Sequence, residues 1–182
     1  MWSARLLSEL DAADARAIAV ARGLTAEQIN WRAQPGEWSV GQCLEHLAVA
    51  NELYLPPIQK AIEGQPSAPV DEITPGWFAR WFIRNYIAPS AQTRRAKAPS
   101  KIVPSATVSP AVVDRFLETN RQVRDVVRRA TDLDVNRVRF ANPFVPVIHF
   151  TVGTGLEITA KHEARHLLQA ERIRSAMPIA RS

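Results

Sequence analysis

Two histidines four residues apart, His162 and His166, are the side chains of this sequence best suited to metal chemistry. A step of four residues on an α-helix turns by only about 40° and rises about 6 Å, so both imidazoles project from one face. Ile158 and Leu167 continue the same side, which we expect to face the interior of the protein. Because a buried imidazole without a partner loses its hydration, these two histidines need one.

A third histidine, His46, lies on a comparable face of an earlier predicted helix. Three neutral imidazoles from two facing helices can hold a divalent transition-metal ion and leave a coordination position for water or substrate. Such an open position is typical of a catalytic metal centre rather than a structural one. The paired Glu-x-x-His sequences of di-iron carboxylate bundles are absent, which disfavours that class of site.

The stretch from His162 to His166 also reads His-Glu-x-x-His, the pattern of many metalloproteases. In those enzymes a third ligand follows downstream, but only 16 residues follow His166, and none is His, Asp or Cys. The third ligand is therefore expected upstream. A general-base role for Glu163 stays open, although its side chain should point about 100° away from His162, towards a helix boundary or solvent.

Three further side chains could assist at such a site. Cys43 lies one turn before His46 and could bind metal, although the role of a small buried apolar residue is favoured. His149 could serve as an acid or base at the mouth of the site, but a hydrogen-bonded structural histidine is the favoured interpretation. Gln169 follows His166 by three residues and could orient its imidazole.

These side chains need long helices to position them. Apolar residues at three-to-four spacing predict helices over residues 4–22, 40–64, 110–130 and 151–176. We find no convincing set of paired strands, so residues 1–182 are expected to form one all-α domain, a four-helix bundle. The start and stop signals are Ser3 and Gly23 for the first helix, Ser39 with Gln42 for the second, Ser109 with Pro110 for the third, and Thr151 or Thr154 with Pro178 for the last.

Smaller features modify this plan. Thr25 and Gln28 have capping-box spacing and predict a short helical connector. Trp38 should pack against the start of the second helix. Pro56 and Pro57 should kink or interrupt that helix. Residues 65–109 hold six of the 13 prolines and are expected to form an excursion between the second and third helices.

Within this excursion, Thr74 and Pro75 can open a short helix with four aromatic residues at helical spacing. We favour packing of its aromatic face on the bundle, and the alternative is a helix that binds a membrane surface or a partner. The four aromatic residues are Trp77, Phe78, Trp81 and Phe82.

The excess of basic residues behind the net charge of +5 lies in one segment of the chain. Six basic residues and no acidic residue lie between Arg80 and Lys101, which leaves the rest of the chain nearly balanced. Cys43 is the single cysteine, so no intramolecular disulfide can form. With neither a signal peptide nor a run of about 20 apolar residues, the expected location is the cytoplasm, without a membrane span.

Two stretches resemble a known family. The sequence EWSVGQCLEHL, residues 37–47, is similar to the Trp-Ser and His-Leu signature of the DinB-like superfamily, and HEARHLLQAER, residues 162–172, is similar to its closing His-x-x-x-His-x-x-Gln-x-x-Arg signature. The resemblance implies a four-helix bundle of the DinB or YfiT type, often dimeric. It also implies that His46, His162 and His166 bind a divalent metal ion, usually nickel or zinc.

The same resemblance implies a metal-dependent enzyme with a small-molecule substrate. Characterised relatives include thiol-dependent S-transferases and a mycothiol-dependent isomerase, so transfer of a low-molecular-weight thiol is the favoured activity and metal-dependent hydrolysis is the alternative. A relative without activity is a further alternative. The last is a non-enzymatic bundle whose basic aromatic segment 77–101 contacts an acidic partner, although no nucleic-acid-binding module surrounds that segment.

Overall fold

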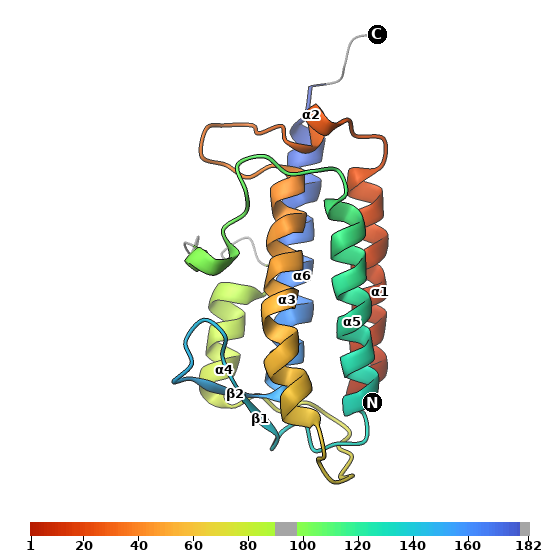
Figure 1. Ribbon diagram of the computed structural model, residues 1–182, viewed down its shortest axis with the longest axis vertical. Coiled ribbons are helices and arrows are strands. Elements are labelled where there is room, and N and C mark those ends of the chain that lie inside the picture. The colour runs from red at the N-terminus through yellow and green to blue at the C-terminus, as the bar shows by residue number, and fades with distance from the viewer. Residues whose placement is uncertain (90–97, 179–182) are drawn as a thin grey trace.

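The computed structural model describes residues 1–89 and 98–178. Its framework is a bundle of four long helices, α1 (Trp2–Ala21), α3 (Val40–Ile62), α5 (Val112–Ala130) and α6 (Val152–Ala176). Helices α3 and α5 run in one direction, and α1 and α6 run in the other (Figure 1). Each of α3 and α1 packs against both α5 and α6. The predicted all-α bundle is therefore confirmed, with boundaries within a few residues of those expected.

Local capping signals set the starts of α2 (Ala26–Ile29), α3 and α6, whereas α1, α4 (Trp77–Phe82) and α5 begin without a side-chain cap. Helix α3 begins after the capping box of Ser39 and Gln42, and the short α2 begins after that of Thr25 and Gln28. Of the two candidate caps for α6, Thr151 is the one used. The first helix lies close to its predicted range, but the prediction that Ser3 is its cap was wrong, because α1 begins at Trp2 and Ser3 is buried within its first turn.

Pro56 and Pro57 lie inside α3, which continues to Ile62, so the predicted interruption does not occur. A proline inside a helix removes a backbone donor and crowds the carbonyl four residues earlier, at a cost of about 3 kcal/mol, so packing must hold this helix together. Ile58 and Ile62, directly after the two prolines, are buried in the core and supply that packing.

The structure also contains a strand pair that the sequence analysis did not predict. Strands β1 (Arg139–Ala141) and β2 (His149–Thr151) pair in antiparallel fashion, with Phe140 opposite Phe150. Each strand has three residues and a single buried side chain, which is too short for a two-residue periodicity to be recognised. This hairpin leads directly into α6.

The proline-rich excursion holds α4 (Trp77–Phe82), the π-helical turn η1 (Ile83–Ile87) and the 3-10 turn η2 (Ser100–Ile102). Gly76, rather than Thr74 or Pro75, precedes α4. Of the four aromatic residues only Phe82 packs against the core, so the prediction that the whole face is covered was wrong. The basic residues Arg94, Arg95 and Lys97 lie outside the described residues.

Two apolar clusters are stacked along the bundle and leave a polar layer at mid-height. Leu10, Ile58 and Val126 belong to one cluster, and Leu44 and Phe116 belong to the other. The buried residues between the clusters include polar side chains from three helices, namely Asn51, Thr119, Asn120 and Glu163. Across residues 1–89 and 98–178, no helix is both long and apolar enough to cross a membrane.

Gly155 is required by the close approach of the hairpin to α6. A Cβ atom at this position would lie 2.6 Å from Cε1 of Phe140, which is closer than real Cβ contacts allow. We expect Gly155→Ala to lower the free energy of unfolding by about 1–2 kcal/mol, because overpacking outweighs the better helix propensity of alanine. Urea denaturation measures the change. Gly76→Ala is the control, since nothing lies within 4 Å of its Cβ position.

Candidate metal centre

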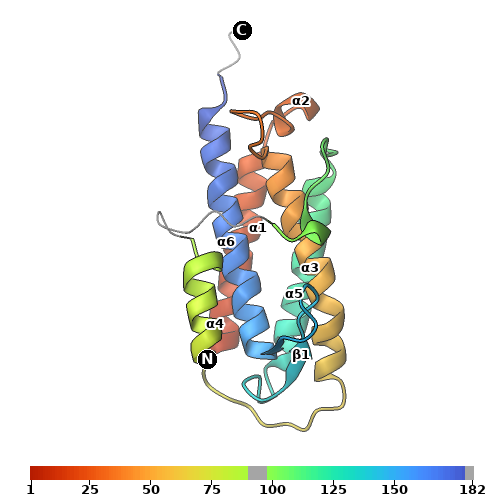
Figure 2. The ribbon, with the colours of Figure 1, turned by 90° about the vertical axis from the view of Figure 1, so that its left-hand side faces the viewer.

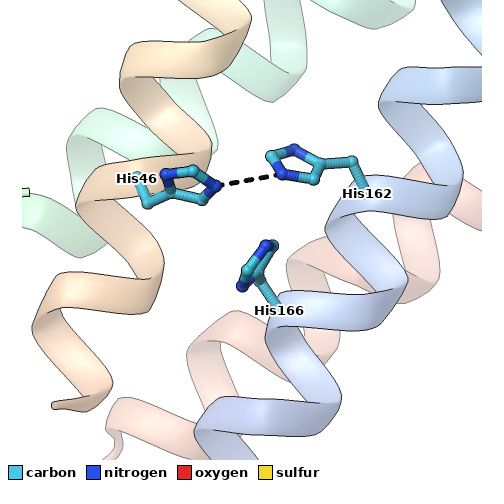
Figure 3. A group of neighbouring side chains, drawn as sticks. All are labelled: His46, His162 and His166. Carbon is cyan, nitrogen blue, oxygen red and sulfur yellow. Dashed lines mark hydrogen bonds between the residues drawn. The ribbon is translucent and has the colours of Figure 1, made fainter. Parts of the chain in front are cut away.

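Three imidazoles meet between two helices of the bundle. His46 comes from α3, and His162 and His166 come from successive turns of α6 (Figure 3). Their candidate ligand atoms all lie within 4.8 Å of one another, and the Nε2 atoms of His46 and His162 are 3.0 Å apart. The structure thus brings together the three histidines that the sequence analysis selected.

The outer nitrogens of two of these imidazoles are held by oxygen acceptors. Nδ1 of His46 lies 2.7 Å from the carbonyl oxygen of Ile102, and Nδ1 of His166 lies 3.0 Å from Oε1 of Gln169. Because these oxygens accept hydrogen bonds, each Nδ1 carries the proton and donates it. The Nε2 lone pairs are then left for the space between the rings, as in proteins where a second contact fixes the tautomer of a metal-binding histidine.

Burial keeps the three imidazoles neutral. It lowers the pKa of His46, lowers the pKa of His162 well below its usual range and lowers the pKa of His166 to about 3. Neighbouring imidazoles and the positive charge of Arg165 act in the same direction for His162 and His166. The neutral form is the one that binds metal ions, so no proton has to leave a charged ring before binding near pH 7.

This donor set fits a divalent transition-metal ion. A tetrahedral ion with nitrogen ligands at about 2.0–2.1 Å needs those nitrogens about 3.3–3.4 Å apart, which small side-chain rotations reach from the spacing described. Three imidazoles without a carboxylate or thiolate suit zinc or nickel and do not suit calcium or magnesium. His46, His162 and His166 would be the residues that hold the ion.

Trp38 forms one wall of the centre. Its ring centroid lies 4.7 Å from that of His46 and 5.5 Å from that of His166. From the sequence, this tryptophan was expected only to pack at the start of the helix. The sequence did contain a signal for this contact. Trp38 directly precedes the capping residue Ser39, and the helix cap fixes where a bulky neighbour must lie. A large apolar ring here restricts the imidazoles and keeps water from one side of them.

Arg165 adds a positive charge that the sequence analysis did not assign. Its guanidinium donates to the backbone carbonyl of Tyr86 in η1, and its charge lowers the pKa of all three histidines. Burial in turn lowers the pKa of Arg165 itself. The candidate centre therefore has neutral metal-binding groups beside a cation, an arrangement suited to an anionic ligand or substrate.

Two of the additional candidates do not join the three imidazoles. Cys43 is fully buried in an apolar cluster, and burial raises the pKa of its thiol, which favours the apolar role. His149 is exposed on β2, about three helical turns before His162. Neither one is in the group of metal-binding side chains.

Glu163 lies inside the bundle, and the prediction that it faces a boundary or solvent was wrong. Its side chain is 1% exposed, and its Oε1 accepts a hydrogen bond of 3.0 Å from Nδ2 of Asn51. Burial raises its pKa to about 8. The expected 100° rotation from His162 is compatible with this outcome, because α6 has a neighbouring helix on both sides and the rotation turns Glu163 towards the polar layer.

Helix arrangement and site together define a helical bundle with a candidate three-histidine metal centre. The chain belongs to the DinB superfamily, whose family model matches residues 9–170. A similar solved structure is YfiT from Bacillus subtilis, described as "a probable metal-dependent hydrolase with an unusual four-helix bundle topology". The match has a TM-score of 0.61 at 16% identity and covers 94% of this chain and 85% of that one, which shows a shared fold. No curated protein matches the sequence.

Cys43 offers a check on the composition of the centre. We expect Cys43→Ala to bind the same amount of metal as the unmodified protein, because the thiol lies in the apolar core. The folded protein should also resist alkylation by iodoacetamide near pH 8, where a buried thiol stays protonated, and should react once urea unfolds it. Mass spectrometry of the alkylated chain gives the result. Rapid modification of the folded protein would contradict the described burial.

Proposed function

We propose that this protein is a metal-dependent enzyme in which His46, His162 and His166 hold a divalent transition-metal ion, nickel or zinc. The observation that carries the proposal is the convergence of three neutral imidazoles within 4.8 Å, two of them with Nδ1 held by an oxygen acceptor. The description of YfiT as a probable metal-dependent hydrolase supports the same class of activity.

A bound ion of this kind acts as a Lewis acid that lowers the pKa of a thiol or a water molecule. The residues of the chain supply the remaining functions. The carbonyl of Ile102 and the amide of Gln169 hold the Nδ1 protons, and the ring of Trp38 shields the imidazoles from water. Arg165 provides the charge that would hold an anionic group of the substrate.

We infer that the favoured reaction is transfer of a low-molecular-weight thiol to an electrophilic carbon. The thiol loses its proton to solvent, its sulfur bonds to the carbon, and the leaving group on that carbon departs with the electron pair of the broken bond. Support comes from the resemblance of residues 37–47 and 162–172 to the DinB-like signatures and from Arg165, whose charge complements the carboxylate that a thiol such as cysteine carries. Hydrolysis of a small molecule is the second candidate, favoured by the description of YfiT. A homodimer and a cytoplasmic location stay predictions.

The test is an activity screen on nickel-loaded and zinc-loaded protein. One arm pairs low-molecular-weight thiols with an electrophilic bimane, and the other offers ester and amide substrates without a thiol. We expect product in the thiol arm, and its loss after chelation and in His162→Ala. His149→Ala is the matched control and should keep full activity, because this imidazole is exposed on β2.

Each result separates the candidates. Product in the ester or amide arm alone would favour hydrolysis over thiol transfer. Activity that survives both chelation and His162→Ala would contradict the metal mechanism in either form.

A further inference from the structure

Three large aromatic side chains are exposed together on α4. Trp77 exposes 77% of its surface, Trp81 43% and Phe78 40%. Their rings form one patch, since the centroid of Phe78 lies 6.0 Å from that of Trp77 and 5.9 Å from that of Trp81. We call these three residues the aromatic patch. Contiguous apolar surface of this kind marks a site of interaction more often than a neutral part of the surface.

The patch is held firmly to the bundle. Ala79, on the opposite side of α4, is buried, and the ring of Phe82 stacks on Phe150 of β2 with centroids 6.3 Å apart. Tyr86 in η1, one turn later, stacks on Phe82 and receives the hydrogen bond of Arg165. The exposed aromatic rings therefore stand on an anchored helix and turn.

A second apolar projection stands on the same side of the molecule. The loop between β1 and β2 exposes Val145 by 44% and Val147 by 87%. Helix α4 and this hairpin both stand out on the left of the bundle in Figure 1, and both face the viewer in Figure 2. The ring contact between Phe82 and Phe150 joins the two elements.

Positive charge is concentrated on the elements that carry these projections. Arg80 and Arg84 line a surface hollow of about 460 Å³ together with Trp77 and Trp81. Helix α4 with η1, residues 77–87, carries Arg80 and Arg84, the hairpin, residues 139–151, carries Arg139, and neither stretch contains an acidic residue. The elements that carry the exposed apolar side chains therefore contribute positive charges and no carboxylate.

We propose that this face docks on an anionic membrane surface, with the aromatic patch in the interfacial layer and with Arg80 and Arg84 paired with lipid phosphates. Tryptophan rings favour the boundary between headgroups and acyl chains, and flanking cations add attraction to acidic lipids. A second copy of this chain is a poorer occupant, because it would bring two arginine-lined faces together. The proposal is independent of the function proposed for the metal centre.

The test measures binding of the full chain to vesicles of phosphatidylcholine with and without phosphatidylglycerol, by sedimentation and by tryptophan emission. We expect binding to the anionic vesicles, a shift of the emission to shorter wavelength, and weakening by salt. Arg80→Gln with Arg84→Gln should weaken binding about 30-fold. Trp77→Ala with Trp81→Ala should weaken it by about tenfold or more and should remove the emission shift.

The matched control is Arg128→Gln with Arg129→Gln, which removes the same charge from exposed positions on α5. It should leave vesicle binding within about twofold of the unmodified protein, because a local contact and not net charge decides the affinity. Circular dichroism confirms that each variant is folded. Equal weakening by the control and by the Arg80 and Arg84 variant would overturn the proposal.

Three other results would also overturn it. The first is the absence of binding to anionic vesicles at low ionic strength. The second is that the protein binds polyglutamate but not vesicles, and that this binding requires Trp77 and Trp81. That result would assign the face to an acidic polypeptide. The third is a dimer that Trp77→Ala with Trp81→Ala dissociates, which would assign the face to a second copy of the chain.

Discussion

Protein purified without a histidine tag is expected to contain one equivalent of a divalent transition metal per chain, and the variant His46→Ala/His162→Ala/His166→Ala none. The three imidazoles are the group of candidate ligand side chains that the structure brings together among the described residues. Loss of His162 alone leaves two nitrogens, so we expect metal affinity to fall by more than about a hundredfold. Elemental analysis and a competition titration with a chelator measure these changes.

Gln169 provides a graded version of the same test. Its Oε1 accepts a hydrogen bond from Nδ1 of His166 at 3.0 Å, and loss of such a contact typically lowers metal affinity about 10–100-fold. Gln169→Ala should therefore bind more weakly than the unmodified protein and more tightly than His162→Ala. His149→Ala should keep a full equivalent. A full equivalent in the folded triple variant would show that the metal is bound elsewhere.

Because Glu163 is buried, its contribution to the stability of the metal-free protein should fall as the pH rises from about 4.5 to about 8. The three histidines, whose pKa values folding lowers, act in the opposite direction below about pH 6.5, so the contribution of Glu163 is measured as the difference between the unmodified protein and Glu163→Gln. The pKa of Glu163 rises from 4.5 to about 8 on folding, so between these values the folded chain keeps a proton that the unfolded chain has released. In this interval Glu163 takes up a proton on folding. Each unit by which the pH rises therefore lowers its contribution to the free energy of unfolding by up to about 1.4 kcal/mol.

Glu163→Gln should remove this contribution and leave that of the three histidines. Glutamine keeps the carbonyl that accepts from Asn51 and cannot ionise, so we expect the variant to exceed the unmodified protein in stability near pH 8, by on the order of several kcal/mol. Glu163→Ala should be less stable than Glu163→Gln, since it leaves the buried amide of Asn51 without this acceptor.

Urea denaturation in the presence of a chelator, near pH 5 and near pH 8, measures both effects. Glu118→Gln is the matched control. Glu118 is exposed on α5 and its pKa lies at about 2, outside this interval, because Arg121 and Gln122 donate hydrogen bonds to it. It should leave the pH dependence unchanged. Parallel curves for the unmodified protein and Glu163→Gln would contradict the described environment of Glu163.

Local signals in the sequence determined much of the fold and the composition of the candidate site. The capping boxes at Thr25 and Ser39 depend on contacts within three residues, so they could be recognised without tertiary structure. The spacing of His162 and His166 places both imidazoles on one helix face by geometry alone. His46 could be added because apolar periodicity indicated which face of its helix is buried and because the family resemblance implied that it binds metal.

Tertiary structure alone decided the features that depend on what lies opposite a given side chain. Glu163 is buried rather than exposed because α6 has helices on both sides, a property that its own sequence does not encode. Trp38 covers two imidazoles because α3 and α6 meet beside it. The exposure of Trp77 and Trp81 likewise follows from which face of α4 reaches the bundle, since apolar spacing shows that a face exists but not whether another element covers it.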